Sequence, residues 1–301
     1  MRTTFFALAA LAAGASSALA SPESHQGMVK VAKRANAPTD TEILNYALTL
    51  EYLERNFYAD VLKKFSATDF KKAGYAPRVR ERFQALAKQE ASHVQFLEAA
   101  LGTNAVSDCS YIFGLTSVKA VVSTARLLEN IGVSAYLGAA GDIQSKEYLA
   151  AAGSILTVEA RHASYLNEIN GASGFPNAYD SPLDYAQVYS LAAPIIIPNT
   201  CGKAAPLPAS IQKFPALTLK TKTPRAGHTS AFSFAPKQGY SGDYYVAYIA
   251  DGQTQYSKVG AEQTAHIPKG LTGLVFAIVT TSPNALTDAN TVAGPAPIFL
   301  A

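Results

Sequence analysis

The stretch from Pro77 to Leu101 reads PRVRERFQALAKQEASHVQFLEAAL and predicts one long amphipathic helix. Its apolar residues recur at steps of three and four, so they share one face. A proline is tolerated in the first turn of a helix, and Gly102 follows where a helix commonly ends. Glu90 and His93 interrupt this apolar face three residues apart, so both side chains point the same way.

Three more segments between residues 39 and 171 carry the same helical spacing. The last of them contains a second Glu-x-x-His pair, Glu159 and His162, on its apolar face. The other two each place a single glutamate on that face. The ionisable residues predicted to meet in one core are Glu51, Glu90, His93, Glu129, Glu159 and His162.

Four glutamates in one apolar core are costly, because an unpaired buried charge costs several kcal/mol. A whole domain is stable by only about 5–15 kcal/mol. Two divalent cations would balance four carboxylates, and neutral imidazoles would add nitrogen ligands without charge. The sequence therefore predicts a four-helix bundle that holds two divalent metal ions, with iron or manganese preferred. The alternative is a metal-free bundle with hydrogen-bonded carboxyl groups.

The segment ILNYALTLEYLE, residues 43–54, and the two Glu-x-x-His pairs resemble the ferritin-like superfamily. The similarity is greatest to secreted fungal and plant members related to stress or desiccation. In that superfamily the metal-binding glutamate of the first helix is often followed by a tyrosine seven residues later. Glu51 and Tyr58 match this spacing, and Glu129 and Tyr136 repeat it. The resemblance implies a mainly helical fold whose members include oxidases, peroxidases, catalases, ferroxidases and storage proteins.

Two assignments stay open at this point. Glu54 also lies on the first apolar face. It is a candidate metal ligand, a partner for a histidine, or half of an ion pair with an arginine, and the Tyr58 spacing favours Glu51 as the ligand. Tyr58 and Tyr136 either pack in the core or take part in electron transfer.

The beginning of the chain predicts export. A basic second residue, an apolar run over residues 5–12 and the small residues around Ala20 are typical of a signal peptide covering residues 1–20. Residues 21–34 end in Lys33-Arg34 and are interpreted as a pro-segment, with a solvated linker as the alternative. The protein is therefore predicted to be secreted.

The predicted organisation is a ferritin-like bundle over residues 35–198, a linker over 199–213 and a small β-sandwich-like domain over 214–301. The linker is rich in Pro, Ala and Gly, and the region after it alternates apolar and polar residues in several short runs. Asp251-Gly252 lies between two such runs and predicts a hairpin. A fifth, shorter helix is expected between residues 182 and 193.

Composition limits the classes of partner. The net charge of +3 is small and no Lys/Arg block occurs, so no nucleic-acid partner is expected. No apolar run of about 18 residues follows the signal peptide, so no membrane span is expected. The two cysteines, Cys109 and Cys201, are predicted to form a disulfide in an oxidising compartment.

The leading functional hypothesis is a secreted metal-dependent oxidoreductase that reacts with O₂ or peroxide in stress defence. One alternative is a non-enzymatic metal-binding or surface protein whose β domain mediates interactions. Iron storage is the third hypothesis. It ranks last, because an appended β domain would obstruct the closed cage that storage needs. Whether the protein is an enzyme stays open at this stage.

Overall fold

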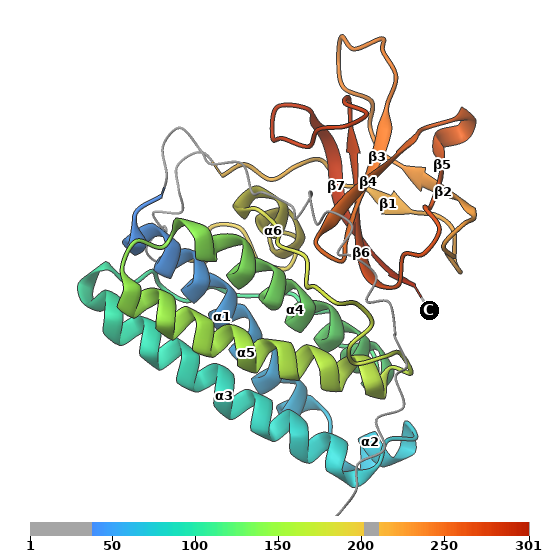
Figure 1. Cartoon of the computed structure of the whole chain (residues 1–301). Helices are drawn as coiled ribbons and strands as arrows, with labels where there is room; N and C mark the ends of the chain where they lie inside the picture. The colour runs from blue at the N-terminus through green and yellow to red at the C-terminus, as the bar shows by residue number, and fades with distance from the viewer. Residues whose placement is uncertain (1–37, 202–210, 301) are drawn as a thin grey trace, which may run out of the picture.

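The computed structural model describes residues 38–201 and 211–300 (Figure 1). A helical domain comes first and an antiparallel-sheet domain follows, as the sequence predicts. The predicted signal peptide, the predicted pro-segment and most of the predicted linker lie outside the described residues.

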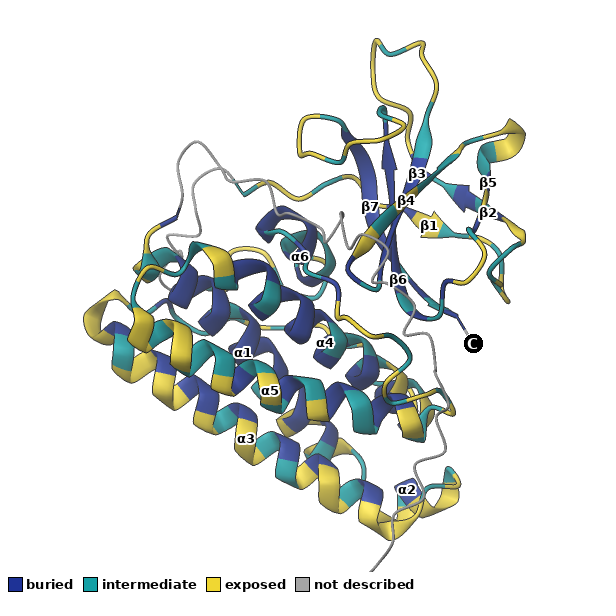
Figure 2. Cartoon of the chain, viewed as in Figure 1, coloured by how far each residue is buried: buried dark blue, intermediate teal, exposed yellow. Residues whose placement is uncertain are grey.

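Four long helices form the bundle, and two short helices flank it (Figure 1). Helix α1 packs on α3 and α4 packs on α5, while α1 also contacts α4. Figure 2 shows that the faces directed into the bundle are buried and the outer faces are exposed. The α-helices of the described chain are α1 (Asp40–Lys64), α2 (Ala67–Lys72), α3 (Pro77–Leu101), α4 (Val118–Ala139), α5 (Lys146–Ile169) and α6 (Tyr185–Ala192).

Side-chain caps set the beginnings of the described α-helices except α3, which begins at Pro77 without one. Thr39 and Glu42 form a capping box at the start of α1, and Ser117 caps α4 through the backbone N–H of Ala120. Helix α2 was not predicted, because six residues are too few to display a helical period. Ser66 caps it with a capping box of its own.

The long connection between α3 and α4 is fastened to the bundle. Asp108 forms an ion pair with Arg55 and accepts a hydrogen bond from Tyr111. The predicted disulfide between Cys109 and Cys201 is present, and it joins this connection to the end of the helical domain.

The strands form two antiparallel sheets with the orders β1-β2-β5 and β4-β3-β6-β7. An apolar cluster between the sheets contains Phe232 from the first and Val246 and Val275 from the second, as in a sandwich. Asp251 and Gly252 both have positive φ angles, 50° and 64°, and close the predicted hairpin between β3 and β4. The strands are β1 (Thr218–Leu219), β2 (Thr229–Ser233), β3 (Tyr245–Ala250), β4 (Gln253–Lys258), β5 (Thr264–His266), β6 (Gly273–Thr280) and β7 (Thr291–Leu300).

The four-stranded sheet is buried on both faces. Its second face contributes Ile249, Phe276 and Ile278 to the apolar cluster that also forms the bundle core. Strands β3 and β6 are therefore almost continuously buried, unlike the half-buried strands that an alternating pattern predicts. Helix α6 lies at this junction, in contact with α4 on one side and β7 on the other (Figure 1).

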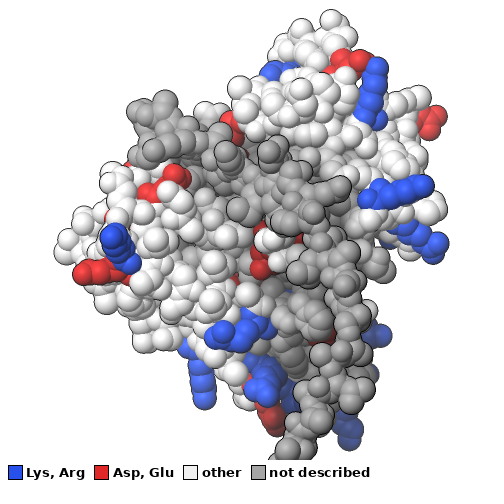
Figure 3. Space-filling view, in the orientation of Figure 1, with Lys and Arg blue, Asp and Glu red and all other residues white. Residues whose placement is uncertain are grey.

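Arg126 of α4 joins the two domains. Its guanidinium carbon lies 3.6 Å from the centroid of the Phe299 ring of β7, and its Nε donates to Asn167 of α5 at 2.6 Å. On the face shown in Figure 3 the basic side chains are spread over both domains. Among the helices of residues 38–201 and 211–300, none combines the length and apolar character that a membrane span requires.

Candidate metal centre

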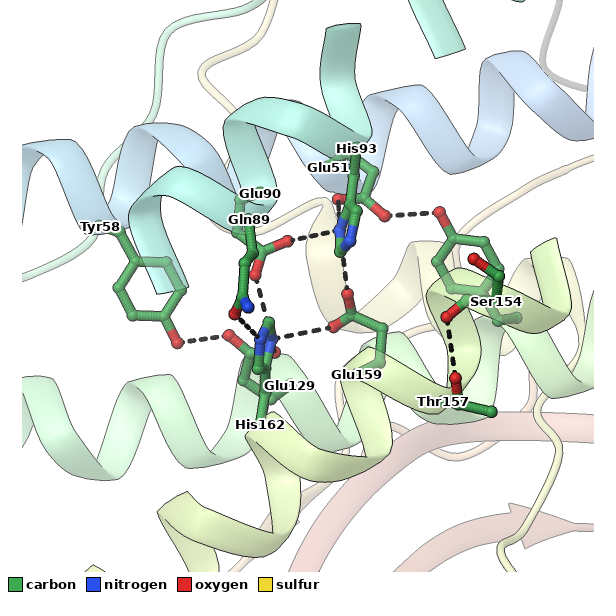
Figure 4. A network of polar contacts seen from close by, with 11 residues as sticks. Glu51, Tyr58, Gln89, Glu90, His93, Glu129, Ser154, Thr157, Glu159 and His162 are labelled. Carbon is green, nitrogen blue, oxygen red and sulfur yellow. Dashed lines mark hydrogen bonds and ion pairs between the residues drawn. The ribbon is translucent and has the colours of Figure 1, made fainter. Parts of the chain in front are cut away.

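The structure brings all six predicted site residues together in the bundle core (Figure 4). Their side chains come from the four long helices and face one another. All four glutamates are fully buried, whereas His93 keeps 9% and His162 7% of its surface exposed. The two histidines are therefore the site residues nearest to solvent.

His93 lies among three carboxylates. Its Nδ1 is 3.1 Å from an oxygen of Glu90, 3.2 Å from Glu51 and 3.3 Å from Glu159. A single ring nitrogen carries at most one proton, so it cannot satisfy three acceptors at once.

His162 occupies the equivalent place in the other half of the bundle. Its Nδ1 is 3.0 Å from Glu129, 3.1 Å from Glu90 and 3.9 Å from Glu159. Glu90 and Glu159 thus approach both histidines and lie between them (Figure 4).

These contacts define two overlapping groups of possible ligands. In each group the four ligand atoms lie within 4.8 Å of one another. Glu90 and Glu159 belong to both groups, while each remaining residue belongs to one. The first group is Glu51, Glu90, His93 and Glu159, and the second is Glu90, Glu129, Glu159 and His162.

The carboxylates of the core strongly perturb the histidines. Burial alone would lower the pKa of His93, but the close carboxylates of Glu159, Glu51 and Glu90 outweigh it and raise that pKa to about 12. For His162, burial also lowers the pKa, but the carboxylates of Glu129 and Glu90 outweigh it and raise the pKa to about 9. Without metal, both histidines are therefore in the positively charged imidazolium form near neutral pH, and their charge offsets part of the negative charge of the carboxylates.

The glutamates divide into two kinds. Burial tends to raise the pKa of Glu90, but the adjacent rings of His162 and His93 outweigh it and lower the pKa to about 2. Burial and then the charge of Glu90 raise the pKa of Glu159 well above its ordinary value. Burial likewise raises the pKa of Glu51 to about 7. The core therefore has more carboxylate than its histidine protons can neutralise.

Some oxygens of the core have no hydrogen bond. Oε1 of Glu90 and both oxygens of Glu159 are buried without such a bond, although histidine nitrogens lie at ion-pair distance from them. Buried polar atoms are almost always satisfied in native proteins. Two cations held by Glu90, Glu159 and their neighbours would satisfy these oxygens, so the residues present fit a dinuclear metal centre.

Two tyrosines reach across the bundle to Glu51 and Glu129, the glutamates that belong to only one ligand group each. Tyr58 of α1 donates its hydroxyl proton to Glu129 of α4, and Tyr136 of α4 donates to Glu51 of α1. Both tyrosines are buried, and their hydroxyls orient the two glutamates that belong to one group each. The tyrosines therefore do more than pack in the core, because each hydroxyl also holds one carboxylate in place.

Glu54 faces the same core. It is 4% exposed, and within the described residues it makes no ion pair with an arginine; its neighbour Arg55 pairs with Asp108. Gly132 of α4 leaves room for it. A Cβ atom at Gly132 would lie 3.3 Å from Oε1 of Glu54 and 3.2 Å from Oε2 of Glu159. The core thus contains a fifth carboxylate outside both groups.

Gln89 was missed by the sequence analysis. It is exposed on α3, and its Oε1 lies 2.7 Å from Nε2 of His162 (Figure 4). Apolar periodicity gives no signal for such a residue, because it lies off the buried face. The only indication was its place directly before Glu90.

Comparison with known proteins agrees with the architecture. Residues 39–172 match the ferritin-like domain family, which supports a ferritin-like helical domain in this part of the chain. Protein rds1 of Schizosaccharomyces pombe (strain 972) is 28% identical over 158 residues, which cover 52% of this chain. The match spans 39% of that relative's length. The family match ends before α6 and includes neither sheet.

Proposed function

We propose that the bundle binds two divalent metal ions, iron or manganese, one in each of the two overlapping groups. The observation that carries this proposal is the position of Glu90 and Glu159, which lie between the two histidines and have buried oxygens without hydrogen bonds. Glu51 with His93 and Glu129 with His162 would complete the two sides. The match of residues 39–172 to the ferritin-like domain family supports the same assignment.

The function that this site supports best is that of an oxidoreductase acting on O₂ or peroxide. A pair of iron or manganese ions supplies the electrons that such a reaction exchanges. The chain contributes a buried site that limits access of water, and Tyr58 and Tyr136 hold two carboxylates in place. We also propose that the protein is secreted and acts in stress defence. The disulfide supports secretion, because such bonds persist in oxidising compartments.

Metal analysis tests the first part. The purified protein is expected to carry two iron or manganese ions per chain by mass spectrometry of the metals. Glu90→Ala and His162→Ala should abolish this stoichiometry, whereas Glu81→Ala, an exposed change on the same helix α3, should leave it intact. Unchanged stoichiometry in both site variants would overturn the site assignment.

Turnover separates the enzyme from its non-enzymatic alternative. Consumption of O₂ and loss of peroxide are measured with the metal-loaded protein and with Glu90→Ala. Turnover by the loaded protein alone supports the oxidoreductase. Two bound metal ions without turnover would instead favour a metal-binding protein whose β domain serves interactions.

A further inference from the structure

The centre is built by two similar helix pairs. The pair α1–α3 and the pair α4–α5 each supply a glutamate, a Glu-x-x-His pair and a tyrosine at the same spacing. These parts make equivalent contacts, including the reciprocal tyrosine hydrogen bonds. The matched residues are Glu51 and Glu129, Glu90 and Glu159, His93 and His162, and Tyr58 and Tyr136.

The histidine environments break this symmetry. Gln89, directly before Glu90, lies 2.7 Å from Nε2 of His162. The equivalent residue before Glu159 is Val158, whose side chain cannot form a hydrogen bond. Within residues 38–201 and 211–300, no hydrogen bond reaches Nε2 of His93. One imidazole is therefore held from both sides and the other from one side only.

A bond of this kind matters for metal affinity. When the second ring nitrogen donates to an acceptor, the tautomer and orientation of a ligating histidine are fixed. With Nε2–H donating to Gln89, Nδ1 of His162 is free to face the core, where its carboxylate neighbours lie. Loss of such a partner typically costs about 10- to 100-fold in metal affinity.

The fifth carboxylate breaks the symmetry a second time. Glu54 stands three residues after Glu51 in α1, and the equivalent position in α4, three residues after Glu129, is Gly132. Oxygens of Glu54 and Glu159 share the space above Gly132, one helical turn from Glu129. The additional carboxyl group is thus close to the α4 side of the core, which carries Glu129.

We propose that the two metal positions are unequal, and that the position of Glu129 and His162 binds metal more tightly and fills first. Gln89 is a positioning residue that acts through His162, and Glu54 places a further carboxyl group near the same side. The position of Glu51 and His93 is the weaker one, because no hydrogen bond of the described residues holds Nε2 of His93. This inference rests on the proposed dinuclear centre.

A zinc titration of the metal-free protein tests the order of filling. Imidazole signals are followed by NMR in protein labelled at histidine, with His93→Ala used to identify the signal of His93. The signal of His162 is expected to shift during the first equivalent and that of His93 during the second. Calorimetry on the same sample should resolve two affinities about 10- to 100-fold apart.

Three variants isolate the role of Gln89. Gln89→Leu should weaken the tighter step about 10- to 100-fold, and Gln89→Glu, which keeps an acceptor oxygen, should restore it. Gln84→Leu, a change at another exposed glutamine of α3, should leave both steps unchanged. Because Gln89 is exposed, its replacement is not expected to disturb folding, which circular dichroism checks.

The results separate this inference from the function it rests on. Absence of bound zinc, together with absence of iron and manganese, would refute the dinuclear centre itself. Two equal affinities, or a first shift at His93, would overturn the proposed inequality while leaving the centre intact. An unchanged first step in Gln89→Leu would remove Gln89 from its positioning role.

Discussion

Replacing Glu159 by glutamine should make the metal-free protein more stable and the metal-loaded protein less stable than the wild type. Glu159 is fully buried, and neither of its oxygens has a hydrogen bond. Its pKa is raised well above the ordinary range, first by burial and then by Glu90 and Glu129. A neutral amide of the same shape keeps an acceptor for His93 and adds two donors for neighbouring carboxylates.

The size of the effect follows from these contacts. An unsatisfied buried polar group costs about 1–3 kcal/mol, so relief of the carboxyl should stabilise the metal-free protein by about 2 kcal/mol. For a domain of about 150–250 residues this raises Tm by about 4–8 °C. Metal at a free concentration of about 100 times Kd stabilises the wild type by about 2.7 kcal/mol per site. The variant loses this gain, because Glu159 belongs to both ligand groups.

The assay is thermal unfolding with a chelator and with excess manganese. The Tm of Glu159→Gln should lie above the wild type with chelator and below it with manganese. Glu81→Gln, an exposed replacement, should follow the wild type in both conditions. A variant that is less stable than the wild type in the presence of chelator would refute the argument that metal-free carboxylates strain the core.

Three further predictions concern the site and its frame. Gly132→Ala should weaken metal binding about tenfold in a calorimetric titration, because its Cβ would lie 3.2 Å from a site carboxylate. Gly153→Ala in α5 has nothing within 4 Å and should leave affinity unchanged while adding up to about 1 kcal/mol of stability. Cys109→Ser should cost about 4 kcal/mol in denaturant unfolding because its bond with Cys201 closes a long loop, and an unchanged midpoint would contradict this. The raised pKa of His162, about 9, stabilises the metal-free fold below about pH 6.5, and this contribution is lost as the pH rises through 9. Metal must displace that proton, so affinity should rise with pH, and calorimetry in buffers of different ionisation enthalpy should detect proton release.

The convergence of the site side chains was predictable because helical spacing alone determines which residues share a buried face. Glu90 and His93 are ionisable residues at positions where the helical spacing calls for apolar ones, and this position on the apolar face identifies them as site candidates. Gln89 gave no such signal, because its contact depends on the distance between α3 and α5 rather than on its own helix. The position of Glu54 also depended on a partner, since Gly132 of another helix provides the space.

The β domain was predicted in outline and less well in detail. Strand β7 contains Pro295 and Pro297, which argue against a strand interior in a sequence pattern. The structure places β7 at the edge of its sheet, where a residue without a backbone N–H is tolerated. Burial of β3 on both faces also depends on the bundle, which strand periodicity does not register.

The two-sided burial of the four-stranded sheet affects how this chain can be divided. Ile249, Phe276 and Ile278 face the helical domain, so separating the domains would expose apolar surface on both fragments. A shortened chain that ends after α6 would resemble the family match more closely, yet it would be prone to self-association. The β domain is therefore an integral part of the packing around the bundle rather than a module that can be transferred to another protein.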